Sequence, residues 1–374
     1  MKDIKQIYVH LKMKNKSYNV GILADIRGKI YFEYDTKFLK TGFELSLFKL
    51  PLKSGARENK DSEFNSIFGL FHDSFLNPFS ENSLEALLNL NEKNSIGSLQ
   101  YSKTKKIIDE KSEPFYETVI LSEIQQSSEE KKLLIQVDKR KSNILYNKEI
   151  LKEDYRYWMM KIPALNSPSY IANLEYAYSL MAKKAGLEIP NSYLFRTDTQ
   201  EVYYAIQRFD RDAKELFHIH TLAGLLHRDA RLHSLDYDDF LSVTLAITKN
   251  IKDVDKAFRL VCFIILSHSK NYNENSIAFL MNNKGDWHLA PATNLIFAYG
   301  DSGKYSIKIM GERSWVKMEH LIKLAKAHDI KNSMKVLEEV SKAVASWMSF
   351  ATIANVPREE ALKIDTILNR INQK

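Results

Sequence analysis

The sequence predicts an α+β protein of two lobes, with a sheet-rich N-terminal part and a helix-rich C-terminal lobe. Up to about residue 208, many short runs are rich in β-branched and aromatic residues and are bounded by polar turns, which is typical of strands. After residue 211 the apolar residues recur mainly at helical spacing. The 374 residues, 44% of them hydrophobic, are enough for a sizeable core or for two packed lobes.

Residues 1 to about 100 form the first part, which we expect to be a small α+β lobe. Strand-like runs separated by polar turns predict an antiparallel meander, and one further strand-like run follows it before a polar loop. These four runs are residues 7–11, 18–23, 29–34 and 46–52. Helical patterns then cover residues 63–75 and 83–90, and Ser83 is a candidate N-cap of the second.

The middle of the chain begins with residues 101–155, which are charged and poor in core residues but hold two strand-like runs. A third run is followed by an amphipathic helix that ends at Gly186, with Pro190 just beyond it, a common combination at helix ends. Two more strand-like runs come after this helix. The strand-like runs are residues 117–121, 133–137, 155–162, 192–196 and 202–208, and the helix is residues 169–185.

The last part of the chain is dominated by six helical patterns, which a short strand pair interrupts. The helical patterns are residues 220–226, 238–248, 253–267, 317–328, 332–351 and 358–372, and the strand pair is residues 278–281 and 287–290. A sheet-rich lobe followed by a helix-rich lobe is the layout of protein kinases, and other two-lobed enzymes share it.

The composition says more about the environment of the protein than about its function. Its 54 Lys and Arg against 47 Asp and Glu give a net charge of +7, which we interpret as a lysine-rich solvated surface, with an anionic partner as the alternative. The single cysteine, Cys262, lies in an apolar run, excludes an intramolecular disulfide and fits a reducing cytoplasm. Because the sequence shows neither a signal peptide nor an apolar stretch long enough to span a bilayer, we expect a soluble cytoplasmic protein without membrane contact.

Short motifs follow one another in a set order along nearly the whole chain. They are the meander, residues 43–52, 64–76 and 96–101, Met160-Lys161-Ile162-Pro163, Asn173-Leu174-Glu175, residues 182–190, Gln207-Arg208-Phe209-Asp210-Arg211, and residues 220–226 and 287–295. Any one of them would be a weak match, but the ordered set resembles the HipA family of bacterial toxin kinases. The resemblance implies a HipA-like, protein-kinase-like fold with an N-terminal subdomain (1–101), a kinase N-lobe-like region (102–212) and a helical C-lobe (213–374).

The resemblance also implies ATP-dependent phosphorylation of serine or threonine, which needs groups that hold the triphosphate. Lys161 takes the place of the family's nucleotide lysine, and Glu175 on the following helix is placed to pair with it. The other implied nucleotide contacts lie in the family's phosphate loop and are Ser127, Ser128 and Lys132. Ser128 replaces a glycine of that loop and two glutamates follow it, so the loop is poorly suited to a triphosphate. The alternative interpretation of the loop is a solvated turn, and that of Lys161 and Glu175 is a purely structural ion pair.

In this chain, the segment that corresponds to the family's catalytic segment lacks the general base. When Asn275 is taken as the metal-binding asparagine, the base position holds Lys270, or Asn271 after a shift of one residue. An ammonium group does not accept a proton at neutral pH unless its pKa falls by several units. Glu274 is acidic but stands next to Asn275, away from the base position. The family's metal aspartate is Asn294 here, and two neutral amides would bind Mg²⁺ weakly at best.

Two histidine patterns suggest other chemistry. Residues 227–229 spell His-Arg-Asp, the catalytic triplet of eukaryotic kinases, but Ser234 stands where the following asparagine is expected, so we interpret them as a polar helix end. His218 and His220 alternate as metal ligands can, yet no carboxylate or cysteine follows at ligand spacing. We expect both to be surface histidines.

We interpret the chain as a pseudokinase of toxin–antitoxin type that keeps Lys161 and Glu175 and acts by binding another protein. ATP and Mg²⁺ are implied only by the resemblance. One alternative is an active serine/threonine kinase toxin that modifies a translation factor, and another is a nucleotidyl transferase on the same fold. The resemblance further implies a small, HipB-like antitoxin as a partner, with DNA reached only through it, because no segment resembles a DNA-reading helix-turn-helix.

Overall fold

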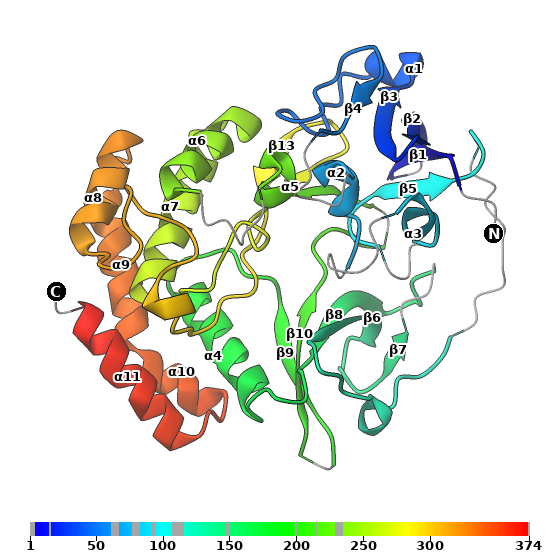
Figure 1. The fold of residues 1–374 in the computed structure, drawn as a ribbon. Coiled ribbons are helices and arrows are strands. Elements are labelled where there is room, and N and C mark those ends of the chain that lie inside the picture. Colours follow the sequence, from blue (N-terminus) through cyan, green and yellow to red (C-terminus); the bar gives the residue numbers. More distant parts are fainter. Residues whose placement is uncertain are drawn as a thin grey trace.

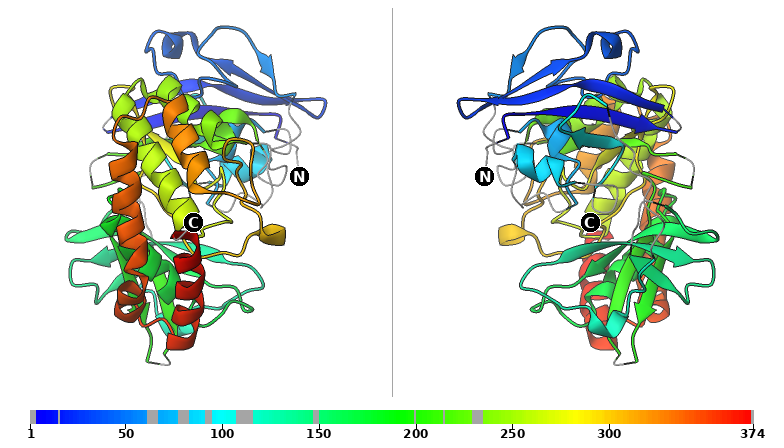
Figure 2. Two further views of the ribbon diagram at one scale, coloured as in Figure 1. Left: turned by 90° about the vertical axis from the view of Figure 1, so that its left-hand side faces the viewer. Right: turned by 90° about the vertical axis from the view of Figure 1, so that its right-hand side faces the viewer.

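The computed structural model describes residues 4–14, 16–60, 67–76, 83–90, 95–106, 116–146, 150–198, 200–213, 215–228 and 235–372. In this part of the chain the fold is α+β, with three sheets and a set of helices that gather in the C-terminal half (Figure 1). The N-terminal sheet and the second sheet lie at opposite ends of the molecule, and the C-terminal helices run along one side (Figure 2). No helix of the described residues is long and apolar enough to cross a membrane.

The N-terminal sheet is antiparallel and has the strand order β4-β3-β2-β1-β5. Its strands are β1 (Gln6–Met13), β2 (Lys16–Ile26), β3 (Lys29–Tyr34), β4 (Arg57–Glu58) and β5 (Leu99–Ser102). The expected meander is confirmed, because the first three strands pair in sequence order. Alternate side chains of β1, such as Ile7, Val9 and Leu11, are fully buried, which is the pattern of a strand with one face on the core.

Three short helices accompany this sheet, namely α1 (Thr36–Leu39), α2 (Gly69–His72) and α3 (Leu84–Leu88). Ser83 caps α3 as expected, because its Oγ accepts a hydrogen bond of 3.0 Å from the Ala86 N–H. The helix expected over residues 63–75 is limited to α2 within the described residues, and residues 61–66 lie outside them.

The second sheet is also antiparallel, with the order β7-β6-β8-β10-β9. Its strands are β6 (Lys131–Asp138), β7 (Ile144–Tyr146), β8 (Tyr155–Ile162), β9 (Ser192–Arg196) and β10 (Val202–Gln207). The helix α4 (Ile171–Lys184) packs on β9 and β10. It ends before Gly186, whose φ of +81° lies in the left-handed region that glycine adopts without strain.

Two expected strands of the N-terminal half are wrong. Residues 46–52 form turns, in which the Leu50 carbonyl accepts a hydrogen bond of 2.6 Å from the Tyr34 hydroxyl instead of a ladder partner. Residues 117–121 contribute only an isolated bridge from Thr118 to Leu145, and a 3₁₀ helix follows at Leu121–Glu123. Both runs have strand-like composition, but β-structure also requires a neighbouring strand with free pairing groups.

The C-terminal half combines a small sheet with the remaining helices. The antiparallel strands are β11 (His218–Thr221), β12 (Ala278–Met281) and β13 (Trp287–Leu289). The helices are α5 (Leu222–Leu226), α6 (Tyr237–Thr248), α7 (Ile251–Leu266), α8 (Met318–Ala327), α9 (Ser333–Ala345), α10 (Trp347–Ile353) and α11 (Arg358–Asn372), with a 3₁₀ turn at Asp301–Gly303. The central helix is α7, which buries most of its side chains, including the Cys262 thiol as expected.

Two expected helices of this half differ in their limits. The pattern over residues 220–226 begins as strand, because His220 and Thr221 pair with β12, and α5 starts only after the Thr221 cap. The pattern over residues 332–351 is two helices that meet at Ser346. The break directs Trp347 into the core, where the indole N–H donates a hydrogen bond of 2.9 Å to the Ala361 carbonyl.

Candidate functional site

A cavity of about 150 Å³, which we call the cavity between the lobes, lies where the three sheet-bearing parts of the chain meet. The N-terminal part contributes side chains around α2, the second sheet contributes β6, β8 and β10, and the C-terminal part contributes the segments that flank β12. The polar side chains that line it are His72, Asp73, Lys132, Arg208, Asp210, Thr221, Asn275, Ser276, Thr293 and Asn294. Its volume lies below the roughly 300–1,000 Å³ of typical small-molecule pockets, so a nucleotide would require it to widen.

The Lys161–Glu175 pair forms as the sequence suggested. The Lys161 Nζ lies 2.6 Å from the Glu175 Oε1, and the two side chains are only 11% and 8% exposed. Strand β8 supplies the lysine and α4 supplies the glutamate, so the pair fastens the helix to the sheet. Burial opposes the charge of Lys161, but the adjacent Glu175 carboxylate outweighs it and raises the pKa of the lysine. Lys161 therefore stays an ammonium group.

Lys132 rather than Lys161 lines the cavity. The two lysines are direct partners across β6 and β8, and no carboxylate pairs with Lys132 in the described part of the chain. Burial and the neighbouring Lys161 charge both lower the pKa of Lys132. A positive charge that is poorly compensated inside a cavity favours an anionic ligand there.

The remaining residues of the expected phosphate loop do not reach the cavity. Ser127 begins a turn, because its hydroxyl donates to the Glu129 carbonyl at 2.8 Å and its own carbonyl accepts from the Leu165 N–H. Ser128 and Glu130 are exposed. The arrangement is that of a solvated turn before β6.

The two expected metal ligands, Asn275 and Asn294, do line the same cavity. Asn294 has a φ of +59°, a left-handed conformation that asparagine adopts more readily than most residues, and its Nδ2 lies 3.4 Å from the Ser276 Oγ. The Asn275 N–H is bound to the Asn273 side chain. Within the described residues no three His, Cys, Asp or Glu side chains form a metal-binding group. A donor set of neutral amides and hydroxyls fits Mg²⁺ poorly, because this hard cation prefers carboxylates and phosphates.

The expected base position lies apart from the cavity lining. Lys270 donates from Nζ to the Gly303 carbonyl at 2.6 Å and lies over the Tyr305 ring, 5.2 Å from its centroid. Burial lowers the pKa of Lys270. Its neighbour Asn271 is exposed, and Glu274 is only 1% exposed, and neither lines the cavity. Lys270, Asn271 and Glu274 therefore all lie outside the lining of the cavity.

Asp210 is one of two carboxylates in the lining. It accepts hydrogen bonds from three N–H donors that belong to two residues. Arg208 donates to it from Nε and Nη2 at 2.8 and 2.5 Å, and the Gly97 N–H donates at 2.8 Å. Arg208 and Arg211 also donate to the Ser95 carbonyl. Burial opposes ionisation, but the two guanidinium groups lower the pKa of Asp210 to about 2. The Arg-Phe-Asp-Arg signature thus connects the second sheet to the turn before β5.

Asp73 is the second carboxylate, and it connects α2 to the C-terminal half. Its oxygens accept hydrogen bonds from the Thr221 N–H and hydroxyl at 2.7 and 2.8 Å and lie 2.5 Å from the His220 Nδ1. Burial opposes ionisation, but His220 and the Thr221 N–H keep the pKa of Asp73 below its usual value. The sequence interpretation missed Asp73, although a single acid among the apolar residues of segment 64–76 was a usable signal.

The expectation that His218 and His220 are surface histidines is wrong, because both are buried in β11. Burial, with a smaller effect of the His220 charge, lowers the pKa of His218 to about 3, so this ring is neutral. His220 lies between Asp73 and Ser46, whose Oγ is 3.0 Å from the Nε2. The order Ser-His-Asp is that of a hydrolase triad, but Ser46 is 1% exposed and does not line the cavity, so the three residues serve as a structural link.

The His-Arg-Asp triplet also has a structural role. His227 caps the end of α5 with a φ of +50°, and its Nε2 accepts a hydrogen bond of 3.0 Å from the Gly69 N–H. It therefore marks a helix end, as expected, while Asp229 and Ser234 lie outside the described residues. Next to it, α2 and α5 touch through Gly69 and Gly224, where a Cβ on Gly69 would meet the Gly224 carbonyl oxygen at 2.2 Å.

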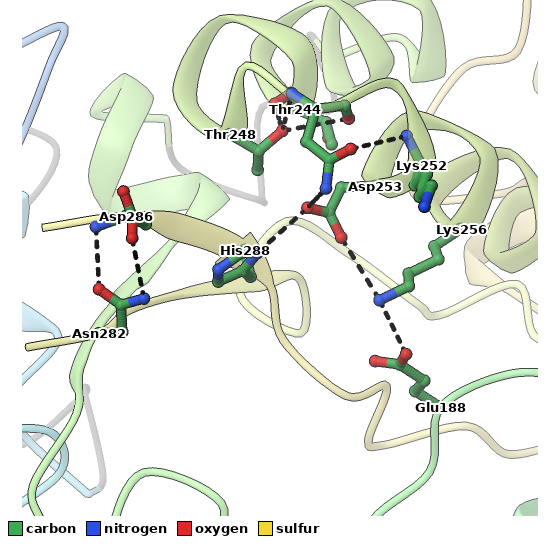
Figure 3. A network of polar contacts seen from close by, with 10 residues as sticks. Glu188, Thr244, Thr248, Lys252, Asp253, Lys256, Asn282, Asp286 and His288 are labelled. Atoms are coloured by element: carbon green, nitrogen blue, oxygen red, sulfur yellow. Dashed lines mark hydrogen bonds and ion pairs between the residues drawn. The ribbon is translucent and has the colours of Figure 1, made fainter. Parts of the chain in front are cut away.

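A second polar network lies at the start of α7 (Figure 3), and none of the residues labelled there lines the cavity. Asp253, 1% exposed, accepts from the Asn250 Nδ2 at 3.1 Å and lies 3.5 Å from both the Lys256 Nζ and the His288 Nδ1. Lys256 continues to Glu188 at 2.7 Å. The network joins the N-terminus of α7, β13 and the segment after α4, and a carboxylate in a first helical turn is favourable for the helix.

Comparison with known proteins places the chain in a family. The model of the HipA-like C-terminal domain matches residues 129–348, more than half of the chain. A chain of the HipA, HipB and operator DNA complex from the toxin–antitoxin system of Shewanella oneidensis MR-1 superposes with a TM-score of 0.70 at 13% identity. That match covers 98% of this chain and 95% of the other.

A weaker likeness is to the proinflammatory kinase CtkA of Helicobacter pylori, with a TM-score of 0.40, 11% identity and coverage of 59% of this chain and 87% of that one. No curated protein sequence matches. The expected fold is confirmed by the superposition with the Shewanella complex, and by the family match the chain belongs to the HipA-like family.

Proposed function

We propose that this chain is a HipA-like protein of toxin–antitoxin type that has lost phosphoryl transfer and acts by binding another protein. The observation that carries the proposal is the lining of the cavity between the lobes, where amides and an ammonium group occur but the carboxylates are already engaged. Phosphoryl transfer needs charged metal ligands and an acceptor for the hydroxyl proton. Asn275 and Asn294 supply no negative charge to a metal ion.

The two carboxylates of the lining are poor substitutes for the lost base. A general base works best when its pKa is close to the working pH, and the neighbouring arginines lower the pKa of Asp210 to about 2. Asp73 likewise has a lowered pKa and accepts three hydrogen bonds from His220 and Thr221. A proton taken by either would weaken the bonds between the N-terminal part and the rest of the chain.

Incubation of the purified chain with labelled ATP and Mg²⁺ or Mn²⁺ tests this proposal, with an active HipA-type kinase assayed in parallel. We expect no label on the chain or on added protein substrates. Transfer that disappears in both Lys161→Ala and Lys161→Arg would overturn the proposal. The arginine variant keeps a positive charge next to Glu175, so it controls for loss of the fold.

The second candidate is a residual ATP-dependent activity, which the Lys161–Glu175 pair favours. Kinases use such a pair to orient the phosphate lysine, and here it forms at 2.6 Å. Thermal unfolding with and without ATP separates the candidates, because a ligand at a hundred times its Kd stabilises a protein by about 2.7 kcal/mol. A rise in Tm that requires Mg²⁺ and is lost in Lys132→Ala would support nucleotide binding in the cavity.

We further propose a small DNA-binding partner of the HipB kind, through which the chain would reach DNA. The superposed Shewanella chain is described in complex with HipB and operator DNA. Mixing the chain with a HipB-like protein and measuring the mass of the complex by light scattering tests this. Binding of operator DNA by the chain without that partner would contradict the indirect route.

A further inference from the structure

A second cavity lies in the second sheet and is about three times as large as the one between the lobes, with a volume of about 460 Å³ against about 150 Å³. It opens at the end of the sheet where β6 and β10 finish and where β8 and β9 begin. Helix α4 forms one wall with Tyr176, Ser179, Leu180 and Lys183, which follow one another at the spacing of a single helix face. This volume falls within the roughly 300–1,000 Å³ of small-molecule pockets.

The lining of this cavity is strongly basic. Four cationic side chains come from three separate segments, namely Lys139, Lys141, Arg156 and Lys183. The acidic side chain in the lining, Asp138, accepts hydrogen bonds from the Ser142 and Asn143 N–H groups and from the Asn143 side chain. Burial opposes the charge of Asp138, but these donors lower its pKa. The Asp138 carboxylate is therefore bound by donors of its own turn and not by the cations of the lining.

The four cations differ in their ion pairing, and Asp154 also attracts Arg156 through its charge. Lys139 pairs with Asp154 at 2.6 Å. By contrast, Lys141, Arg156 and Lys183 form no ion pair with any described carboxylate. Lys141 lies over the Tyr193 ring at 4.9 Å, and Arg156 donates to the Tyr155 carbonyl. A concave site that holds three such charges attracts anions more strongly than scattered surface lysines do.

The lining of the cavity also includes neutral hydrogen-bonding groups. The Ser179 and Ser192 hydroxyls lie 3.1 Å apart, and the Asn191 Nδ2 donates to the Gln207 Oε1 at 3.0 Å. All four residues line the cavity. Hydroxyl and amide groups beside cations are the usual partners of phosphate oxygens.

We propose that this cavity binds a small anion with two or more phosphate groups. Three cations without ion-pair partners match the charge of a diphosphate near neutral pH, and a single carboxylate would leave most of that charge uncompensated. The inference does not depend on the proposed function, because no residue of this cavity lines the cavity between the lobes. Free polyphosphate and the phosphates of a nucleotide share the same chemistry, and the experiment separates them.

Isothermal titration calorimetry of the full chain with pyrophosphate, and separately with ADP, tests the proposal. We expect pyrophosphate to bind, and we expect Arg156→Ala or Lys183→Ala to raise its Kd about tenfold or more, the effect of losing one hydrogen bond to a charged group. Tighter binding of ADP that shows the same dependence on these residues would identify a nucleotide as the source of the phosphates.

Lys184→Ala is the matched control, because Lys184 follows Lys183 in α4, is also exposed and does not line the cavity. Circular dichroism of each variant without ligand verifies that it is folded. The proposal is overturned if pyrophosphate does not bind at millimolar concentration, or if Lys184→Ala weakens binding as much as Lys183→Ala. It is also overturned if binding disappears in Lys132→Ala instead, since that residue belongs to the other cavity.

Discussion

Asp210 makes the stability of the protein depend on pH in the acidic range. Its pKa is about 2 in the folded chain against 3.8 ordinarily, so it stabilises the fold above the unfolded value and loses this contribution as the pH falls from about 4 to about 2. The difference corresponds to about 2 kcal/mol. We expect the stability gap between the wild type and Asp210→Asn, measured by urea unfolding, to shrink over this range.

The exposed Asp198 is the control, because Asp198→Asn replaces a side chain outside the core and should change the free energy of unfolding little. A gap for Asp210→Asn that stays constant between about pH 4 and about pH 2 would mean that the two arginines do not lower the pKa of Asp210 in this way.

The Lys161–Glu175 pair should be costly to break and much less costly to replace. Lys161→Met leaves a buried carboxylate without its cation, which typically destabilises a protein by about 3–5 kcal/mol. We expect the double variant Lys161→Met/Glu175→Leu to recover most of this loss, because neither charge of the pair remains. A double-mutant cycle by chemical unfolding measures the coupling, and single and double variants of equal stability would contradict it.

The resemblance led to positions in the sequence, but not to their roles. Asn275, Asn294 and Lys132 were expected at one site and do line one cavity, whereas Lys270 is bound to a carbonyl outside it. The role of Asp210 could not be derived from local patterns, because its partner Gly97 is 113 residues away. The burial of a histidine such as His220 likewise cannot be predicted from the sequence before its partner carboxylate is known.

At the scale of elements, the contact between α2 and α5 depends on glycine. A Cβ on Gly69 would lie 2.2 Å from the Gly224 carbonyl oxygen and 2.6 Å from its Cα, so the helices would have to separate. We expect Gly69→Ala to destabilise the chain by about 1–3 kcal/mol, the usual cost of overpacking. Thermal unfolding measures this loss of stability. The control is Glu85→Ala, because Glu85 is an exposed residue of α3. A neutral effect of Gly69→Ala would show that the helices can move apart freely.

Elements with a strong local pattern were predicted well, and those that depend on a distant partner were not. The limits of β8, β9, β12 and α11 agree with the expected ranges to the residue. By contrast, β11 takes two residues of an expected helix, since its pairing with β12 is encoded almost sixty residues later. The break between α9 and α10 likewise follows from the place of Trp347 in the core, which helical periodicity does not report.

At the scale of the molecule, the N-terminal part is connected to both of the others by buried polar groups. Asp210 and Arg208 bind the turn at residues 95–97, and Asp73 binds β11 through Thr221. Asp73, Arg208 and Asp210 all line the cavity between the lobes. The Arg208 and Asp210 side chains of the Arg-Phe-Asp-Arg segment therefore support the fold, whether or not phosphate is transferred.

These connections predict that the chain unfolds as one cooperative unit despite its three sheets. Unfolding the N-terminal part alone would take the Gly97 donor from Asp210, the Ser95 acceptor from Arg208 and the Asp73 acceptor from Thr221. Each group left buried without its partner costs about 1–3 kcal/mol, or more when charged. We expect a single calorimetric transition whose van't Hoff and calorimetric enthalpies agree. In Asp73→Ala, which removes the bonds to β11, a separate low-temperature transition should appear. Two transitions already present in the wild type would show that the buried links are too weak to couple the parts.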